Sequence, residues 1–331
     1  MKWHFLILLI AFCSCGNSEK DAGDNLPVEI DFYAAEKKRI YMDELFDKIE
    51  VIPLETTPDC LLQDYPWIAG ITDGNVLMKN DFVGACLFSR KEGRFIHNVG
   101  KKGQGPDEYI LVGGTFCKEK NLMYANRGNT WIGINIETNK VEERVKKPYF
   151  TNLKIAGGVD NPYRLNDSLY MGYINNITGD IKYKIAVFNR NGEAVHLYPN
   201  HLLYPKKNQN EFIYVPGIFY RYKKKLCFYS GIVMDTIYTI KDTYLQARYA
   251  FHFNKKGFPY ENMDSQDFSI LDYTTLRRFM EYDNKLLFTY RAGSFGEGVG
   301  FYDKGKKTTI LCSKEDQAIH FRDESYPPFY P

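Results

Sequence analysis

The sequence lacks an excess of charge of either sign, because 43 Lys and Arg residues stand against 41 Asp and Glu residues. Nucleic-acid binding needs a basic face or stripe, so this balance predicts no nucleic-acid partner. Long apolar runs are also scarce. The run near the amino terminus, Phe5–Phe12, has eight residues, whereas a membrane-spanning helix needs about 20. The 331 residues are therefore expected to form one large globular domain or two ordinary ones.

Cysteine patterns that hold metals or disulfides are missing. Five cysteines lie beyond the amino-terminal segment, and no two of them form a CxxC pair, so neither a zinc site nor a disulfide framework is expected. They are Cys60, Cys86, Cys117, Cys227 and Cys312. Two catalytic signatures, H-E-x-x-H and G-x-S-x-G, are missing as well. We therefore predict no metal and no cofactor.

Aromatic residues, by contrast, are abundant. They make up 16% of the chain, with 26 Tyr and 23 Phe. Aromatic side chains suit the pleated, half-buried surface of a sheet, so the predicted fold class is all-β. Two segments depart from the strand pattern, Met42–Lys48 and Leu271–Arg278, and each is predicted as a short helical turn.

A motif of a polar turn followed by a short apolar strand recurs five times. The first apolar positions of the copies are Val76, Leu122, Leu169, Leu226 and Leu286. A predicted hairpin follows each copy, at residues 86–96, 132–141, 185–195, 236–245 and 299–308. In the third hairpin, Asn191–Gly192 is typical of a two-residue turn because both residues tolerate positive φ. Each repeat therefore reads as four short antiparallel strands.

Four-stranded sheets that pack radially bury both faces and leave only short edges, which is the arrangement of β-propeller blades. At roughly 50 residues per blade, the chain holds about six. The sixth blade is expected to join the strands Val28–Phe32 and Glu50–Leu54 to the tail Ala318–Pro331, which would close the ring. An open or two-domain β-sandwich is the alternative.

The amino terminus predicts export and a lipid anchor. Residues 1–14 have the charged start and short apolar core of a signal peptide. The end of this stretch, Cys13-Ser14-Cys15-Gly16, resembles that of bacterial lipoprotein signals, and Cys15 is the predicted lipid acceptor because small Ser14 precedes it. A multiply acylated cysteine is a stable membrane anchor. Residues 15–26 are predicted as a flexible tether and residues 27–331 as the propeller domain; an ordinary cleaved signal is the alternative.

One loop carries the most specific pattern in the sequence. Residues 100–109 read G-x-x-G-x-G-P-x-E-Y, with Gly100, Gly103, Gly105, Pro106, Glu108 and Tyr109 at the fixed positions. This spacing fits neither phosphate-binding glycine motif, and no predicted helix follows it. We therefore interpret the loop as a structural turn between blades, in which glycines supply positive φ and Pro106 stiffens the exit.

The same loop resembles one found in the six-bladed β-propeller lipoproteins of Bacteroidetes. The segments Ile49–Thr57 and Asp235–Ile240 and the lipoprotein signal are similar to that family too. The resemblance implies an outer-membrane lipoprotein, on the cell surface or the periplasmic face, in a glycan-rich setting. Acidic residues after Cys15 loosely resemble a surface-export signal. Family members usually continue further at the carboxyl end, which leaves open whether the last blade is complete.

The predicted function is a membrane-anchored, non-catalytic binding module for a glycan or an envelope protein. A carbohydrate-active hydrolase or lyase is the first alternative, with loop carboxylates as catalysts. Its candidates are Asp81, Glu108, Asp160 and Glu297, although each is more simply a solvated loop charge. A scaffold beside outer-membrane transport machinery is the second. Trp67 and Trp131 could stack on sugar rings or pack between blades.

Overall fold

The computed structural model describes residues 26–62, 66–80, 84–111, 115–150, 158–205, 215, 217–231, 234–254, 257–260, 273–293, 296–312 and 318–322. Strands dominate, and the helical elements in these ranges are α1 (Met42–Leu45) and the 3-10 turn η1 (Lys118–Lys120). The helix α1 confirms the first predicted helical turn. The second, at Leu271–Arg278, is wrong from residue 274 onward, because the strand Thr274–Glu281 begins there; β-branched threonines suit its extended backbone.

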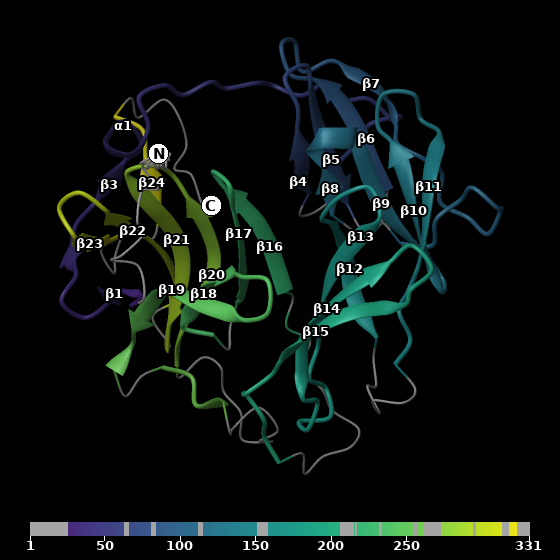
Figure 1. The fold of residues 1–331 in the computed structure, drawn as a ribbon. Helices are drawn as coiled ribbons and strands as arrows, with labels where there is room; N and C mark the ends of the chain where they lie inside the picture. The colour runs from purple at the N-terminus through teal and green to yellow at the C-terminus, as the bar shows by residue number, and fades with distance from the viewer. Residues whose placement is uncertain are drawn as a thin grey trace, which may run out of the picture.

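Five sheets in the described ranges each contain four consecutive antiparallel strands, arranged as the blades of an all-β propeller (Figure 1). The first three sheets are β4 (Trp67–Ile71), β5 (Asn75–Asn80), β6 (Gly84–Ser89) and β7 (Phe95–Asn98); β8 (Phe116–Cys117), β9 (Leu122–Arg127), β10 (Thr130–Asn135) and β11 (Val141–Lys146); and β12 (Val159–Arg164), β13 (Leu169–Ile174), β14 (Tyr183–Asn189) and β15 (Ala194–Pro199).

The fourth and fifth sheets have the same organisation. Their strands are β16 (Gly217–Tyr222), β17 (Lys225–Ser230), β18 (Thr236–Ile240) and β19 (Leu245–His252); and β20 (Thr274–Glu281), β21 (Lys285–Ala292), β22 (Glu297–Asp303) and β23 (Thr308–Leu311). The predicted repeat strands are β5, β9, β13, β17 and β21, and a predicted hairpin follows each, so the repeat analysis is confirmed.

Each of these sheets has two distinct ends. The turns between its first and second strands and between its third and fourth strands lie together at one end, which we call the turn end. The connections between second and third strands and between successive sheets lie at the other, which we call the loop end. This follows from the antiparallel order of the strands, and it places residues 100–109, which follow β7, at the loop end.

Neighbouring sheets pack face to face through buried side chains. The core between the first and second sheets includes Leu87 and Ile132. Aromatic pairs cross the next three boundaries, with ring centroids 6.0, 5.6 and 5.1 Å apart: Trp131 and Phe188, Tyr173 and Phe228, and Phe251 and Phe288. The middle strands are therefore buried on both faces, which explains their nearly continuous apolar runs.

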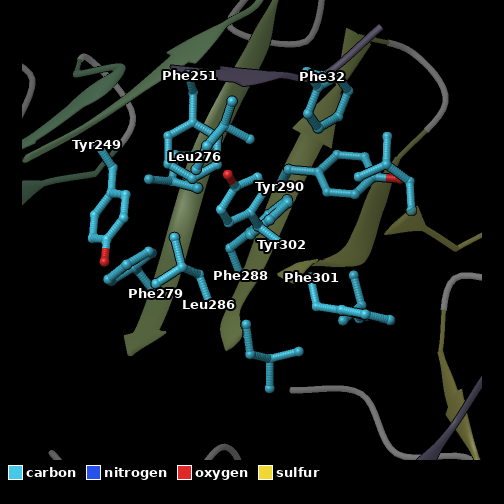
Figure 2. Close-up of a cluster of buried hydrophobic side chains, with 14 of the residues drawn as sticks. Phe32, Tyr249, Phe251, Leu276, Phe279, Leu286, Phe288, Tyr290, Phe301 and Tyr302 are labelled. Atoms are coloured by element: carbon cyan, nitrogen blue, oxygen red, sulfur yellow. The ribbon is translucent and has the colours of Figure 1, made fainter. Parts of the chain in front are cut away.

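The largest core cluster lies between the fourth and fifth sheets (Figure 2). It contains Phe251 and Phe253 of the fourth sheet and its extension, and Phe288 and Tyr290 of the fifth. Phe32, from the amino-terminal part of the domain, packs edge-on against Tyr290 with 4.6 Å between ring centroids. The amino-terminal residues thus contribute directly to the core of blades that lie more than 200 residues later.

Residues 28–62, which we call the perimeter segment, follow the outer edges of several sheets. β1 (Val28–Asp31) pairs in parallel with β19, and β2 (Glu36–Lys37) pairs in parallel with β23. β3 (Ile40–Tyr41) then pairs with β24 (Ile319–His320) in a two-stranded sheet. In Figure 1 the segment continues past α1 and crosses to the sheet that contains β4.

The perimeter segment ends against the first sheet. Glu55 donates its backbone N–H to Gly93 O at 2.9 Å and accepts a hydrogen bond from the Phe95 N–H on its carboxylate at 2.8 Å. Leu54, Cys60 and Leu62 pack on the face of this sheet that the second sheet does not cover. The segment therefore shields both sheet edges and an apolar face.

These contacts correct part of the predicted closure. Val28–Asp31 joins the fourth sheet rather than the carboxyl-terminal tail, and Glu50–Leu54 is not a strand, because it packs through side chains and isolated hydrogen bonds. Ile40–Tyr41 and Ile319–His320 do bring the two ends of the domain together. The described residues thus form three four-stranded sheets, two five-stranded sheets in which β1 and β2 are the added strands, and one two-stranded sheet. Residues 323–331 lie outside them.

Two smaller expectations have different outcomes. The five cysteines of the domain are free, in agreement with the expected lack of a disulfide framework, and all five are buried. The third hairpin does turn at Asn191–Gly192, but only Gly192 of this pair has positive φ, at 81°. Asn189 accepts the Gly192 N–H and donates to Glu193 O, both at 3.0 Å, so the turn has three residues with a bulge instead of two.

Candidate functional site

A cavity of about 330 Å³ lies at the loop end of the boundary between the fourth and fifth sheets. We call it the loop-side cavity. Aromatic side chains from β18, β19 and the connection that follows line it, namely Tyr238, Phe251, Phe253, Phe258 and Tyr260. This volume falls within the range of small-molecule sites in proteins.

Neighbouring side chains hold these aromatic walls in place. Tyr260 packs edge-on against Tyr204, with 5.5 Å between ring centroids, and Phe258 packs edge-on against Tyr273 at 5.4 Å. Tyr204 in turn donates its hydroxyl to Asn176 O at 2.7 Å. Loops from the third sheet thus brace the connection between the fourth and fifth, which preorganises the wall of the cavity.

Polar groups occupy defined positions around the same cavity. Asp235 and Asn254 are exposed at its rim, and Thr274 and Thr275 line it from the start of β20. Thr275 is only 1% exposed, and its hydroxyl has no hydrogen-bond partner within the described residues. A buried hydroxyl without a partner is costly, and Thr275 is one of the residues that line the cavity.

A second cavity, of about 400 Å³, lies at the turn end of the same boundary. We call it the turn-side cavity. Tyr249 lines it, whereas Phe251, two residues further along β19, lines the loop-side cavity; both side chains belong to the core cluster of Figure 2. Four cationic side chains line the turn-side cavity: Lys225, Lys241, Arg248 and Lys304.

Glu281 organises the buried side of this cavity. Its side chain is 0% exposed and accepts hydrogen bonds from Arg248 Nη2 at 2.6 Å, Tyr249 Oη at 2.7 Å and Lys304 Nζ at 3.0 Å. Tyr220 Oη donates to the same carboxylate at 3.1 Å. Burial opposes ionisation of Glu281, but the hydrogen bonds from Arg248, Tyr249 and Lys304 outweigh it and hold the pKa below its ordinary value.

A related cluster occurs at the turn end between the second and third sheets. Buried Glu143 accepts hydrogen bonds from the hydroxyls of Tyr124 and Tyr170, from Arg164 Nη1 at 2.7 Å and from Arg190 Nη2 at 2.7 Å. Here the acid lies on the fourth strand of one sheet and the arginine on the first strand of the next. In the other cluster the arrangement is reversed: Arg248 lies on the fourth strand of one sheet and Glu281 on the first strand of the next.

The structure places the predicted loop motif away from both cavities, between β7 and β8. Glu108 folds back over the loop: its carboxylate accepts the Gly105 N–H at 2.8 Å and pairs with Lys101 Nζ at 2.8 Å. The Lys101 and Gly105 contacts lower the pKa of Glu108. A Cβ on Gly103 would lie 2.1 Å from a Glu108 carboxylate oxygen, and one on Gly105 would lie 3.0 Å from that carboxylate.

The ends of the motif contact the second sheet. Gly100 has a φ of 67°, and a Cβ there would lie 2.5 Å from Ile134 and 2.9 Å from the Tyr109 ring. Tyr109 is buried in the core between the first two sheets. Pro106 accepts a hydrogen bond on its carbonyl from Arg127 Nε at 3.1 Å. The motif residues thus contact each other and the second sheet.

The other candidates lie on different elements. Glu297 is exposed at the start of β22 in the fifth sheet and pairs with Arg277 at 3.4 Å, whereas Glu108 lies between the first and second sheets. Trp131 is buried between sheets, whereas Trp67 is 38% exposed and lies under Lys79 Nζ at 4.9 Å from the ring centroid. Asp81, the Asp160 side chain, and residues 1–25 with Cys15 lie outside the described residues. In the described ranges, no group of three or more His, Cys, Asp and Glu side chains is placed to hold a metal.

Sequence reasoning missed both cavities. Their residues come from strands and loops that are separated along the chain, such as Tyr222, Lys241 and Lys304. Asp235 and Tyr238 belong to the segment Asp235–Ile240, which reads as a strand, but a strand pattern does not show which side chains face a cavity. A useful signal was the turn Lys223-Lys224-Lys225, because three successive lysines give one turn a strong positive charge.

Five sheets that each contain four consecutive antiparallel strands and pack face to face with their neighbours define the protein as an all-β propeller. The chain belongs to the family described as "Domain of unknown function (DUF4934)", whose model matches residues 27–331. No match was found among curated proteins.

Among solved structures, the chain is similar to a protein named "Putative exported protein" from Bacteroides fragilis NCTC 9343. The two share 17% identity and a TM-score of 0.65, over 86% of this chain and 80% of that one. A computationally designed protein, Ika8, matches with 8% identity and a TM-score of 0.36, over 72% of this chain and 58% of that one. In the described part of this chain, no helix is both long and apolar enough to cross a membrane.

Proposed function

We propose that this protein is a lipid-anchored envelope propeller that binds a saccharide at the loop-side cavity without transforming it. The observation that carries this proposal is the combination of aromatic walls and hydrogen-bonding side chains in one cavity of about 330 Å³. Sugar rings present apolar C–H faces and hydroxyl edges, so they are complementary to such a surface. A protein ligand is the other partner class that the sequence predicts.

The arrangement of groups in the cavity favours a neutral saccharide. Phe258 and Tyr260 are half-buried and so offer ring surface to a ligand. The Thr275 hydroxyl has no hydrogen-bond partner in the described residues, and a sugar hydroxyl could supply one. Asp235 and Asn254 at the rim supply further acceptors and donors. Among the described lining residues, Asp235 is the single carboxylate. Glycoside hydrolysis ordinarily uses a pair of carboxyl groups.

Envelope location is the second part of the proposal. The signal-like residues 1–14, Cys15 and the polar residues that follow support lipid anchoring at the outer membrane. The similarity to a protein named as exported is consistent with this location. We further propose that the pair β3–β24 marks a sixth blade position that closes the ring.

The anchor has a direct test. Mass spectrometry of the protein from a host that processes lipoproteins should show acyl mass on Cys15 in the wild type. The Cys15→Ser variant should lose that mass and leave the membrane fraction. An unchanged membrane fraction would contradict lipid attachment at Cys15.

Saccharide binding is tested by calorimetric titration with a panel of neutral oligosaccharides: cellohexaose, xylohexaose, mannohexaose and maltohexaose. At least one should bind the wild-type domain. The Phe258→Ala variant should bind that probe at least about fivefold more weakly, because truncating an aromatic contact costs about 1 kcal/mol or more. Tyr149→Ala removes an aromatic side chain that is 80% exposed and does not line the cavity, so it should bind like the wild type. Binding of none of the probes, or equal loss in both variants, would overturn the assignment.

A further inference from the structure

We propose that the turn-side cavity is a second binding site, specific for an acidic oligosaccharide that carries carboxylate or sulfate groups. It lies at the opposite end of the blade boundary from the loop-side cavity and shares no lining residue with it. It goes beyond the proposed function, since it stands or falls independently of the neutral saccharide site.

The lining of the cavity carries an excess of positive charge. Lys225, Lys241, Arg248 and Lys304 line the cavity, while the nearby carboxylates are Asp283, which also lines it, buried Glu281, and Asp242, which lines the neighbouring cavity. Asp283 is itself engaged, because it accepts a hydrogen bond from Tyr222 Oη at 3.0 Å and lies 3.4 Å from Lys223 Nζ. Four cations against three carboxylates leave a positive surface that favours an anion.

Two of these cations are held in place. Arg248 binds Glu281 through Nε and Nη2, and no residue in the described ranges is bound to its Nη1, which carries two further N–H groups. Lys304 donates to Glu281 and to Tyr282 O at 2.6 Å, which leaves its third N–H. A fixed guanidinium with free donors suits the planar geometry of carboxylate or sulfate, and its prior ordering lowers the entropic cost of binding.

Aromatic rings beside the cations point to a sugar rather than a simple ion. Tyr222 lies under Lys304 Nζ at 4.4 Å and under the Arg248 guanidinium at 5.4 Å, measured to the ring centroid. Tyr244 is 54% exposed and lines the same cavity. An exposed tyrosine next to fixed cations can contact the sugar ring while the cations contact its acidic substituent.

The size of the surface indicates an oligosaccharide. A cavity of about 500 Å³ at the neighbouring boundary, between the third and fourth sheets, shares Lys225, Thr239 and Lys241 with the turn-side cavity. Lys224 lines this neighbouring cavity. The shared lysines therefore link two concave surfaces, so that consecutive sugar units could occupy both.

The test is calorimetric titration of the folded domain with three probes: hexagalacturonate, which carries carboxylates; neocarrahexaose, which carries sulfates; and neoagarohexaose, a neutral galactan control. At least one acidic probe should bind, and more weakly as salt concentration rises. Lys241→Ala and Tyr244→Ala should each weaken that binding at least about fivefold, since charge-assisted hydrogen bonds and aromatic contacts contribute about 1 kcal/mol or more. Neither variant touches the Glu281 cluster.

Two controls make the result decisive. Lys91→Ala removes an exposed lysine from the corresponding turn of the first sheet and should leave binding unchanged. Phe258→Ala, at the loop-side cavity, should also leave acidic binding unchanged, which separates this site from the neutral one. The proposal is overturned if neither acidic probe binds, if neoagarohexaose binds here equally well, or if Lys241→Ala and Tyr244→Ala bind like Lys91→Ala.

Discussion

Arg248 donates two hydrogen bonds to the Glu281 carboxylate across the boundary between the fourth and fifth sheets, from Nε at 3.2 Å and from Nη2 at 2.6 Å. The carboxylate has no exposure to solvent, so this pair cannot exchange its partners for water without separating the sheets. Buried ion pairs contribute modestly to net stability, but removing one partner leaves an uncompensated charge. The pair thus fixes how the two sheets meet and orders the cations that line the turn-side cavity.

Replacing Glu281 should therefore be severe. Glu281→Gln is expected to lower the free energy of unfolding by about 3 kcal/mol at neutral pH, because Arg248 and Lys304 lose their buried counter-charge. The folded-state pKa of Glu281 is lowered, so its contribution is present above the unfolded glutamate pKa and is lost as pH falls through the folded value. Urea unfolding of both proteins should show their difference shrinking towards acid pH. Glu297→Gln, at an exposed pair, should cost under about 0.5 kcal/mol; a similar loss in both variants would contradict this account.

The contribution of Lys184 to the free energy of unfolding should have the opposite pH dependence. Burial lowers its pKa to about 8, and its ammonium contacts Met234 Sδ at 4.0 Å. Between that value and the unfolded lysine pKa, the unfolded chain binds a proton that the folded chain does not, so stability rises with pH. Relative to Lys184→Met, the wild type should gain about 2 kcal/mol between about pH 7.5 and 9.5. Lys182→Met, at an exposed position two residues earlier, should track the wild type; a pH-independent difference for Lys184→Met would refute the prediction.

The glycine loop is expected to act through its backbone. Gly100→Ala should lower the free energy of unfolding by about 2–4 kcal/mol, since it combines a positive φ with contacts of 2.5 and 2.9 Å from the new Cβ. Gly74→Ala is the matched control, because nothing lies within 4 Å of a Cβ there and no positive φ is required. Chemical denaturation of the two variants measures the difference. Equal stability would mean that the loop relaxes freely around the substitution.

The perimeter segment should be essential for folding stability. Ile30 on β1 is fully buried against the fourth and fifth sheets, so Ile30→Ala should cost about 2–4 kcal/mol through lost burial and a residual cavity. Val28, on the same strand, is 40% exposed, and Val28→Ala should cost under about 1 kcal/mol. Thermal unfolding monitored by circular dichroism distinguishes them. A small effect of Ile30→Ala would show that β1 is dispensable.

Much of the fold was accessible from the sequence because its blades are local. A polar turn such as Asp73–Gly74 followed by Val76 and Leu77 specifies a hairpin over a few residues, and alternation assigns the faces. Leu77 and Val76 indeed pack in different core clusters. The strand at Val28–Phe32 was expected, but its pairing with the fourth sheet was not, because the partner strand is distant in the sequence. Ile30 pairs with Phe251, 221 residues later, and no local pattern encodes that register.

The charged clusters around Glu143 and Glu281 could not be predicted from the sequence for a related reason. Glu143 stands in the run Val141-Glu142-Glu143-Arg144, where an acidic residue resembles any solvent-facing strand position. Its hydroxyl and guanidinium partners lie 19 to 47 residues away. Only the three-dimensional packing of neighbouring blades shows that this carboxylate, like Glu281, is buried and compensated.

Binding without chemistry at the loop-side cavity is the central functional claim, and the fate of a bound probe tests it most directly. The neutral hexasaccharide with the highest affinity should be incubated with the domain, recovered and analysed by mass spectrometry. The account predicts recovery of the intact probe at its original mass, together with affinity that Phe258→Ala weakens and Tyr149→Ala does not. Shortened or unsaturated products that disappear in Phe258→Ala would instead identify the cavity as a hydrolase or lyase site.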